Sequence, residues 1–428
     1  MTRRMRILIG IALLALCAQI VPVTNAKTEP KQTWNQWRGP GRDGKVAGPR
    51  WPGRINNANL DKLWRVELAP SYSGPIVSET AVFVTETKDK STEIVRALDR
   101  ATGRELWKTE WAGAISVPFF AKSRGDWIRA TPAYDGKTLY VAGMRDVLIA
   151  LDAKTGAVQW RIDFVKEYNA PVPDFGQVCS PLVDGDFVYM QAANAVVKIN
   201  KKTGKIVWRS FENGKTIMES GAFSSPIIAE MAGRRQLIVQ SREELAGLDL
   251  ESGAPLWQLK VPSFRGMNIL TPVVFGDSIF TSSYQNKSWF FNVSRTGGTF
   301  SVAEAWNNTA QGYMSTPVVI DGYAYLHLAN QRMTCIDLKT GERTWTSKPY
   351  GKYWSMVAQG DRILALDEQG KLLLIKANPK EFELIDEVQV SDDECWAHLA
   401  IVNDEIYIRE LRAMTALRWN SQKDLSIR

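Results

Sequence analysis

Histidine and cysteine are scarce in this chain, and their scarcity excludes several kinds of site. The 428 residues include two histidines, His327 and His398, and four cysteines. Because the histidines are far apart in the sequence, a histidine-based catalytic triad or a histidine-rich metal site is not expected. The sequence also has no G-x-S-x-G motif, no phosphate-binding loop and no C-x-x-C-H haem-attachment motif.

Long apolar runs are absent after residue 26. Residues 1–26 combine the basic stretch MTRRMR, the apolar stretch ILIGIALLALCAQIV and small residues at Thr24 and Ala26. This pattern predicts a secretory signal peptide that is cleaved after Ala26, with an uncleaved membrane anchor as the alternative. Lipid attachment at Cys17 is disfavoured by the bulky Leu16 before it. No later run is long enough to span a bilayer, so we expect no transmembrane span after cleavage.

The remaining cysteines cannot form a complete disulfide framework. Cleavage leaves Cys179, Cys335 and Cys395, an odd number. The fold therefore does not rest on disulfides, even in an oxidising compartment, and we expect three free thiols.

Basic residues are not gathered into a patch. The formal net charge is +7, but Arg3, Arg4 and Arg6 belong to the leader and the other basic residues are scattered. A nucleic-acid partner is therefore not expected. Together with the leader, this predicts an exported protein that is periplasmic or secreted, with peripheral attachment to the outer membrane as a further possibility.

A repeated unit is what the sequence does contain. Each copy has Asp or Asn, then Thr-Gly or Ser-Gly, then a segment that ends on Trp, as in ALDAKTGAVQW at 150–160. The polar residue opens a hairpin turn and Gly supplies the positive φ, so Asp99, Asp152, Asp249 and Asp337 are interpreted as turn-formers. The Trp positions recur every 39 to 53 residues, which is the range of a four-stranded propeller blade.

The start of the unit repeats as well. A small residue followed by Pro precedes an apolar strand in TPAYDGKTLYV from Thr131 and SPLVDGDFVYM from Ser180, and eight such starts can be counted when degenerate copies are included. The last copy, ending at Trp419, lacks a closing strand, whereas LDKLWRVEL at 60–68 is a closing strand without a blade. We therefore predict an all-β, eight-bladed β-propeller in which the N-terminal strand completes the C-terminal blade. Residues 27–59 are an irregular lead-in and residues 60–428 a single domain.

The repeated D-x-x-TG-x-x-x-W unit resembles the PQQ-like repeat family, which includes quinoprotein dehydrogenases and the BamB-type outer-membrane assembly factors. In that family the Trp docks between neighbouring blades. The resemblance therefore implies a structural docking role for Trp64, Trp107, Trp160, Trp208, Trp257, Trp306 and Trp345.

The loops that enter the innermost strands of a propeller form a funnel at one face, so the residues just before each start are candidates for binding. These are a mixture of aromatic, Arg, amide and acidic residues, a composition that suits extended peptides, sugars or planar ligands. The candidates are Tyr72, Trp127, Arg129, Gln177, Glu219, Arg265, Asn268, Tyr313, Tyr353, Trp354, Trp396 and His398.

The resemblance also raises the cofactor PQQ with calcium. Arg129 and Arg265 suit its carboxylates, and Glu219 and Asn268 suit Ca²⁺. However, quinoprotein alcohol dehydrogenases carry an adjacent Cys-Cys pair and an Asp base, and this sequence has no Cys-Cys and no Asp in the corresponding loop NNTAQGYMS. We therefore expect no cofactor and no catalytic residue. The prediction is an exported, monomeric binding or scaffold protein, similar in form to BamB, with an envelope protein, a peptide or a glycan as partner. The alternative is a PQQ-dependent dehydrogenase or a degenerate quinone-binding relative.

Overall fold

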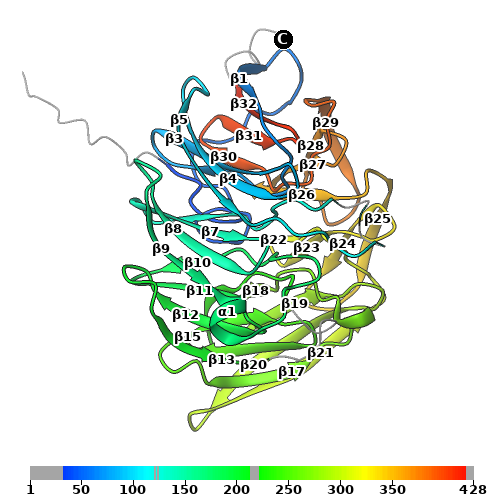
Figure 1. Ribbon diagram of the computed structural model, residues 1–428. Helices are drawn as coiled ribbons and strands as arrows, with labels where there is room; N and C mark the ends of the chain where they lie inside the picture. Colours follow the sequence, from blue (N-terminus) through cyan, green and yellow to red (C-terminus); the bar gives the residue numbers. More distant parts are fainter. Residues whose placement is uncertain (1–31, 120–121, 123–124, 213–220, 421–428) are drawn as a thin grey trace, which may run out of the picture. The chain divides into compact units, whose positions relative to one another are not determined.

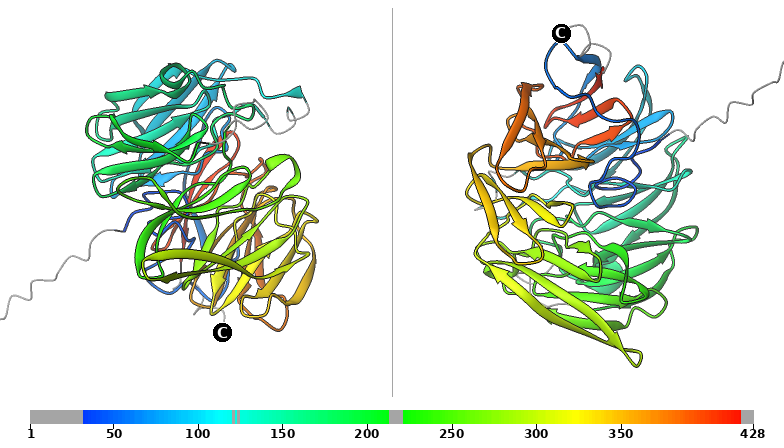
Figure 2. Two further views of the ribbon diagram at one scale, coloured as in Figure 1. Left: turned by 90° about the horizontal axis from the view of Figure 1, so that it is seen from below. Right: turned by 180° about the vertical axis from the view of Figure 1, so that it is seen from behind.

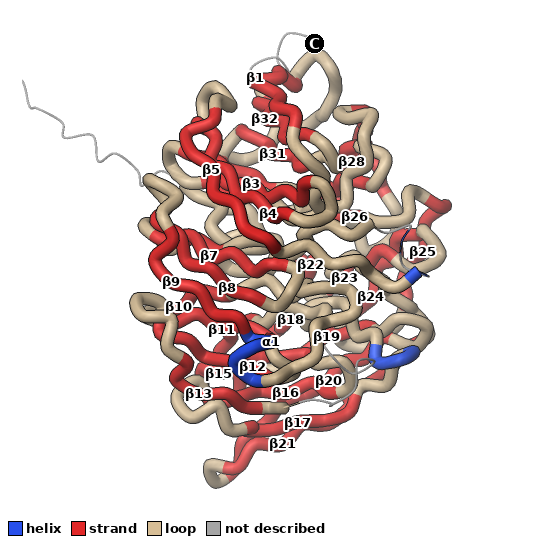
Figure 3. The backbone as a smooth tube through the Cα atoms, viewed as in Figure 1, coloured by secondary structure: helices blue, strands red, loops and turns tan. Residues whose placement is uncertain are grey.

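Strands make up nearly all of the regular structure in the computed structural model, which describes residues 32–119, 122, 125–212 and 221–420 (Figures 1 and 3). These strands form eight antiparallel four-stranded sheets that follow one another in sequence order. The predicted eight-bladed β-propeller is confirmed. The predicted signal peptide, residues 1–26, lies outside the described residues.

The blades are numbered in chain order. The first blade consists of β2 (Ile76–Val77), β3 (Ala81–Lys88), β4 (Thr92–Asp99) and β5 (Glu105–Ala112), and the second of β6 (Ala133–Tyr134), β7 (Thr138–Gly143), β8 (Val147–Asp152) and β9 (Val158–Asp163). The third consists of β10 (Leu182–Asp184), β11 (Phe187–Ala192), β12 (Ala195–Asn200) and β13 (Ile206–Ser210), and the fourth of β14 (Ile227–Met231), β15 (Arg234–Gln240), β16 (Glu244–Asp249) and β17 (Pro255–Lys260). The fifth blade consists of β18 (Val273–Phe275), β19 (Ser278–Ser282), β20 (Ser288–Thr296) and β21 (Thr299–Asn308), and the sixth of β22 (Val318–Ile320), β23 (Tyr323–His327), β24 (Arg332–Asp337) and β25 (Arg343–Pro349). The seventh consists of β26 (Trp354–Gln359), β27 (Arg362–Asp367), β28 (Lys371–Lys376) and β29 (Glu383–Gln389), and the eighth of β30 (Ala400–Val402), β31 (Glu405–Arg409), β32 (Ala413–Trp419) and β1 (Leu60–Glu67). Two short helices are described, α1 (Phe164–Tyr168) and the 3₁₀ turn η3 (Phe264–Gly266).

The strand sequences reflect their place in the blade. The middle strands are covered on both faces by neighbouring blades, so β7 (TLYVAG) and β8 (VLIALD) are continuous apolar runs that are buried almost throughout. The outermost strand β9 (VQWRID) is polar and mostly exposed, with its Trp half-buried. The core therefore lies between the blades as a series of clusters of buried side chains.

The ring closes as predicted. Strand β1 pairs antiparallel with β32, from Leu60 opposite Trp419 to Glu67 opposite Ala413. Blue β1 consequently lies beside red β32 in Figure 1, and the blue, red and orange sheets adjoin in the rear view of Figure 2. The eighth blade thus joins the two ends of the described chain and no open edge remains between the last and first blades.

The repeated Trp residues connect neighbouring blades. Trp107 donates its indole N–H to the carbonyl oxygen of Ala153 in the turn of the next blade, at 3.0 Å. The equivalent bonds to the next blade run from Trp64 to Arg100, Trp160 to Lys201, Trp208 to Leu250, Trp306 to Leu338 and Trp345 to Asn378. The bond from Trp345 to Asn378 shows that a Trp also docks on the seventh blade, although the turn of that blade is irregular. Each bond places a large ring across an interface between blades.

Trp257 differs from this pattern. Its indole N–H donates to Gln236 Oε1 of its own blade, at 2.6 Å, and its ring is 5% exposed. The following blade has the long hairpin of β20 and β21, whose turn at Gly297 has open space where the other turn glycines meet a Trp ring. The acceptor turn therefore lies beyond the reach of Trp257, which packs instead among Phe291 and Val293.

The turn-forming role of the repeated Asp residues is visible in the hydrogen bonds. Asp152 Oδ1 accepts from the main-chain N–H and the hydroxyl of Thr155, and Gly156 has φ +75°. The side chain that opens the turn is therefore hydrogen-bonded within it, as expected for an Asx turn.

Residues 34–46, here called the N-terminal plug, cross the ring. Trp34 pairs with Val77 of the first blade, and Ala358 of the seventh exchanges main-chain bonds of 2.8 Å with Gly44 and Val46. Between them the Asn35 carbonyl accepts from Tyr134 and Gln36 Oε1 accepts from Val183. Because the third and seventh blades lie opposite each other in a ring of eight, the plug passes across the central axis.

No helix among the described residues is both long and apolar enough to cross a membrane.

Candidate functional site

A cavity of about 200 Å³ occupies the axis of the propeller. The first residue of each innermost segment, here called the start residue, forms its middle layer. Seven of the eight start residues line the cavity, Gly74 being the eighth: Thr131, Ser180, Ser225, Thr271, Thr316, Ser355 and His398.

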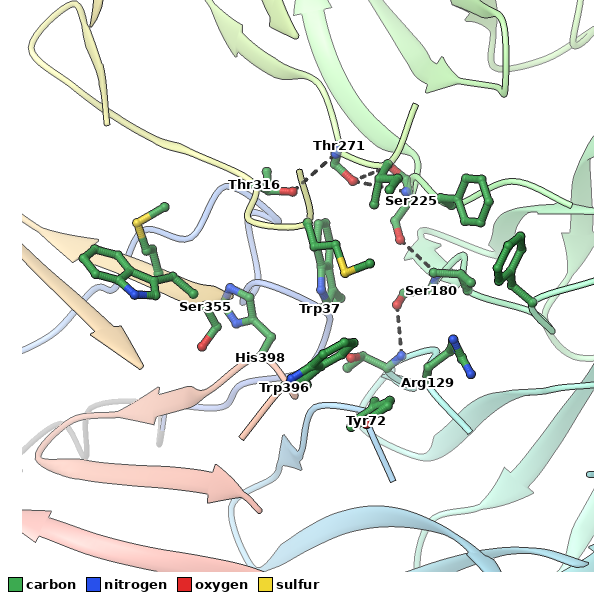
Figure 4. Close-up of a pocket in the computed structure, with 18 of the residues that line it drawn as sticks. Trp37, Tyr72, Arg129, Ser180, Ser225, Thr271, Thr316, Ser355, Trp396 and His398 are labelled. Carbon is green, nitrogen blue, oxygen red and sulfur yellow. Dashed lines mark hydrogen bonds between the residues drawn. The ribbon is translucent and has the colours of Figure 1, made fainter. Parts of the chain in front are cut away.

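A ladder of hydrogen bonds connects the start residues of the first six blades. The main-chain N–H of each start residue donates to the hydroxyl of the next, from Gly74 to Thr131 at 3.0 Å and from Thr131 to Ser180 at 3.0 Å. Bonds of 2.9, 3.1 and 3.3 Å continue it through Ser225, Thr271 and Thr316 (Figure 4). The ladder explains why the residue before Pro is Ser or Thr in the second to sixth blades: its hydroxyl accepts a hydrogen bond from the preceding blade.

Side chains two residues before the start form the upper layer of the cavity. Side chains alternate between the two faces of an extended segment, so the residues at the start and two before it face the axis together. The upper-layer residues that line the cavity are Tyr72, Arg129, Val178, Phe223, Ile269, Met314 and Trp396. Trp354, Phe175, Met267 and Met356 add further apolar wall.

The N-terminal plug supplies the floor. Its contacts fall three residues after the start residues, at Val77, Tyr134, Val183 and Ala358, which is about 10 Å further along the inner strands. Trp37 lines the cavity from below, and its ring lies 6.0 Å from that of His398. The cavity is therefore closed by the plug at one end and lined by the upper layer at the other.

Two buried guanidinium groups hold the plug in place. Arg42 is 4% exposed and donates to the carbonyl oxygens of Ser180 and Pro181, at 3.1 and 2.8 Å. Arg38 is 1% exposed and donates to that of Pro317, at 2.6 Å. Both lie over the faces of the Trp37 ring, 5.6 and 5.7 Å from its centroid. Burial lowers the pKa of each to about 10, so both remain charged at neutral pH.

Aromatic rings form an arc around the open end, here called the aromatic rim. Tyr72 stacks on Trp396 with centroids 4.8 Å apart and meets Trp127 edge-on at 5.3 Å. The arc continues from Trp396 to Tyr353 at 4.1 Å and on to Tyr313 at 5.7 Å. Tyr284 and Phe264 extend it into the fifth blade. The rim thus spans six of the eight blades.

The titratable groups of the cavity carry positive or no charge. Arg129 is fixed by donating to the carbonyl oxygens of Trp127 and Gly125, at 3.3 and 2.9 Å. Burial and the nearby Arg38 charge lower the pKa of His398 to about 3, so its imidazole is neutral. No carboxylate is among the described residues that line the cavity.

The structure gathers most of the predicted funnel residues. Tyr72, Arg129, Trp354, Trp396 and His398 line the cavity, as Figure 4 shows for four of them. Trp127, Tyr313 and Tyr353 belong to the aromatic rim.

Three predicted funnel residues lie elsewhere, and Glu219 falls outside the described residues. Gln177 and Asn268 are each 1% exposed and donate to carbonyl oxygens inside the blades. Both lie three residues before a start residue, where strand alternation turns the side chain away from the axis. Arg265 is exposed, with its guanidinium over the ring of Phe264.

The sequence analysis identified His398 but not the Ser and Thr start residues, the aliphatic and Phe members of the upper layer or Trp37. The repeated small-residue-Pro dipeptide was a usable signal for the first group, because it marks the same place in each blade. Trp37 was not predicted as a lining residue, since it lies in the irregular lead-in outside the repeats.

The described residues do not fit PQQ with calcium. Ca²⁺ takes oxygen ligands, usually including carboxylates. The described part of the lining has no carboxylate, and the predicted ligand Asn268 uses its amide on Arg242, Val261 and Ser283. Cys179 has no adjacent cysteine in the sequence. It is 0% exposed, and burial raises the pKa of its thiol to about 12. We therefore assign no PQQ-dependent chemistry to this cavity.

Comparison with known protein families gives a match to the family described as outer membrane protein assembly factor BamB, over residues 91–347. Among curated relatives, BamB of Yersinia pestis is 25% identical over 264 residues, which is 58% of this chain and 63% of that protein. BamB of Moranella endobia is 22% identical over 331 residues, covering 75% of this chain and 71% of that protein. The dehydrogenase subunit of the quinone alcohol dehydrogenase of Gluconacetobacter polyoxogenes is 26% identical, over 42% of this chain and 25% of that protein.

Solved structures show the same fold. BamB from Moraxella catarrhalis superposes with a TM-score of 0.61 at 16% identity, covering 84% of this chain and 99% of that one. A quinohemoprotein alcohol dehydrogenase from Pseudomonas putida HK5 superposes with a TM-score of 0.63 at 12% identity, covering 91% and 80%. At these identities the similarity establishes the propeller and not a shared activity.

Proposed function

The chain belongs to the family described as outer membrane protein assembly factor BamB, and we propose that it is an exported, non-catalytic scaffold protein of the bacterial envelope. In this proposal it holds a protein component of outer-membrane assembly against the aromatic rim. The basic and apolar leader, residues 1–26, supports export. The partner class is carried by the family relationship, since a propeller fold alone does not specify one.

The observation that carries the proposal is the asymmetry of the two ends of the channel. One end is closed by the N-terminal plug, whereas the other presents the aromatic rim. Trp and Tyr are enriched among the residues that dominate protein–protein binding, because they bury much apolar area and still offer a polar edge. Trp127 and Tyr353 are half-buried, so part of each ring is available to a partner.

Affinity capture tests this proposal. Tagged protein is used to recover partners from detergent-solubilised envelope, and the double variant Trp127→Ala/Tyr353→Ala is compared with the wild type. The variant Val158→Ala is the control, because Val158 is 55% exposed on the outer strand β9, away from the rim.

We expect the wild type and the control to recover an outer-membrane assembly component, and the rim variant to lose at least about tenfold of it. Equal recovery by the rim variant would overturn the rim as the binding surface. Recovery of no such component by the wild type would overturn the proposed function.

A further inference from the structure

We propose that the aromatic rim binds its partner through an arginine side chain, at a place where carboxylates lie beside the aromatic rings. This inference rests on the proposed function and deepens it, because it specifies the chemistry of the segment that the rim holds. The surface lies outside the central cavity, whose described lining contains no carboxylate. Its carboxylates, here called the acidic sector, belong to Glu368, Asp392, Asp393 and Glu394.

The acidic sector lies where the seventh blade meets the eighth. Glu368 is in the turn between β27 and β28, whereas the other three residues are in the loop that enters the eighth blade. The Glu368 carbonyl oxygen accepts from the main-chain N–H of Cys395 at 2.9 Å, which holds the turn and the loop together.

Two carboxylates of the sector contact residues of the aromatic rim. Glu368 Oε2 accepts from the main-chain N–H of Tyr353 at 3.2 Å. Tyr72 donates its hydroxyl to Glu394 Oε2 at 3.4 Å. Negative charge is therefore placed directly beside the rings of the rim.

The acidic sector carries more negative than positive charge. Within the described part of the chain, Asp393 forms a salt bridge with Arg412 at 3.4 Å, and the other three carboxylates form none. When the exposed Lys352 is counted as a second cation, the four carboxylates still outnumber the positive charges. Burial and the charges of Asp393 and Glu368 raise the pKa of Glu394. A cation supplied by a partner would offset this repulsion, so the surface is complementary to positive charge.

The rings beside these carboxylates favour the same kind of group. Tyr72 stacks on Trp396 with centroids 4.8 Å apart (Figure 4), and Tyr353 meets Trp396 edge-on at 4.1 Å. Trp396 and Tyr353 are half-buried, so part of each ring is open to a partner. Ring faces attract cations, and Trp does so most strongly.

Among cations, the arrangement favours an arginine within a polypeptide. The guanidinium group is planar, stacks on aromatic faces and binds carboxylates through two parallel hydrogen bonds. The Trp396 indole N–H is buried and has no hydrogen-bond partner among the described residues. It is therefore a donor for a main-chain carbonyl next to the arginine, which a free cation lacks.

The first test is a calorimetric titration of the mature protein, at low salt, with a peptide of three arginines that has blocked ends. The matched probe is the same peptide with citrulline in place of arginine, which keeps the shape and removes the charge. We expect the arginine peptide to bind at least about tenfold more tightly. Because the chain as a whole is net positive, this preference would reflect the local carboxylates. Equal affinity for the two peptides, or no binding of the arginine peptide at millimolar concentration, would rule out the proposal.

Single variants test the two parts of the surface. Glu394→Gln removes the charge but keeps an oxygen for the Tyr72 hydroxyl, and we expect it to weaken binding of the arginine peptide about tenfold. Tyr353→Leu removes a ring, and we expect a loss of about fivefold. The control is Glu342→Gln, which removes the same charge from an exposed residue between β24 and β25. Thermal unfolding establishes that each variant is folded, and equal losses in Glu394→Gln and the control would contradict the assignment.

Failure of this inference is distinguishable from failure of the proposed function. If Trp127→Ala/Tyr353→Ala loses the captured partner, Glu394→Gln retains it and the two peptides bind equally, the scaffold function stands and the arginine does not. If the arginine peptide is preferred but the wild type captures no assembly component, the cation site stands and the scaffold function does not.

Discussion

At the scale of single residues, glycine and tryptophan are paired across five of the eight blade interfaces. A Cβ atom added to Gly156 would lie 2.5 Å from Trp107 Cε3 and 2.8 Å from Thr109 Oγ1. Equivalent contacts connect Gly103 with Trp64 and Gly204 with Trp160. The turn glycine is therefore needed for its positive φ and also for the space that the docked indole occupies.

We expect Gly156→Ala to destabilise the protein more than Gly136→Ala. Both glycines have positive φ, +75° and +97°, so both variants lose about 1 kcal/mol from backbone strain. Only at Gly156 does the new methyl group meet the docked Trp, which adds about 1–3 kcal/mol, since nothing lies within 4 Å at Gly136. The measurement is urea unfolding of the two variants; equal losses would show that the indole does not depend on this space.

The sequence predicted the cavity residues only in part, and the alternation of side chains explains where it failed. Tyr72, Arg129 and Trp396 line the cavity because they lie two positions before a start. Gln177 and Asn268 were assigned to the same funnel from a position one residue earlier, which faces the blade interior. A one-residue difference in an extended segment reverses the direction of the side chain, and residue type alone does not reveal the phase.

At the scale of elements, buried carboxyl groups connect neighbouring blades through their turns. Asp146, between β7 and β8, is 2% exposed and accepts from the Ala193 N–H of the third blade at 2.7 Å, while its Oδ1 has no partner among the described residues. Burial, together with the Asp163 charge, raises the pKa of Asp146 to about 7. Burial likewise raises that of Glu93 to about 7.

These raised pKa values predict lower stability at higher pH. The unfolded chain releases these protons near pH 4, whereas the folded protein keeps them to about pH 7. The folded state therefore binds more protons in this window, and the free energy of unfolding falls as pH rises through it. Asp146→Asn keeps the acceptor oxygen without the charge, so urea unfolding should show a shallower fall between about pH 4 and 8. If the free energy of unfolding of the variant falls with pH as steeply as that of the wild type, the prediction is wrong.

The sequence predicted the elements better than it predicted their exceptions. The hairpin turns, the eight starts and the closure of the ring by β1 follow from the repeat, because each copy carries the same turn residues and the same buried strand pattern. Trp257 and the N-terminal plug do not follow from it. The first depends on the length of the next hairpin, and the second on contacts with blades that are distant in sequence.

At the scale of the whole molecule, the fold is held without disulfides among the described residues. Cys179, Cys335 and Cys395 are free and buried, and burial raises the pKa of their thiols to about 12, 11 and 12. We expect no reaction with a thiol reagent in the native protein and three equivalents after unfolding of the mature chain. A single equivalent after unfolding would reveal a disulfide and contradict the structure.

The two ends of the central channel differ, because the N-terminal plug lies at one end and the aromatic rim at the other. Site-specific photocrosslinking in the intact envelope tests this most directly, with the crosslinking residue p-benzoylphenylalanine placed at Tyr353 of the rim or at Val158 of the outer strand β9. We expect a crosslink from Tyr353 to a protein of outer-membrane assembly and none from Val158. A crosslink from Val158 alone, or none from either position, would show that this propeller does not bind its partner at the rim.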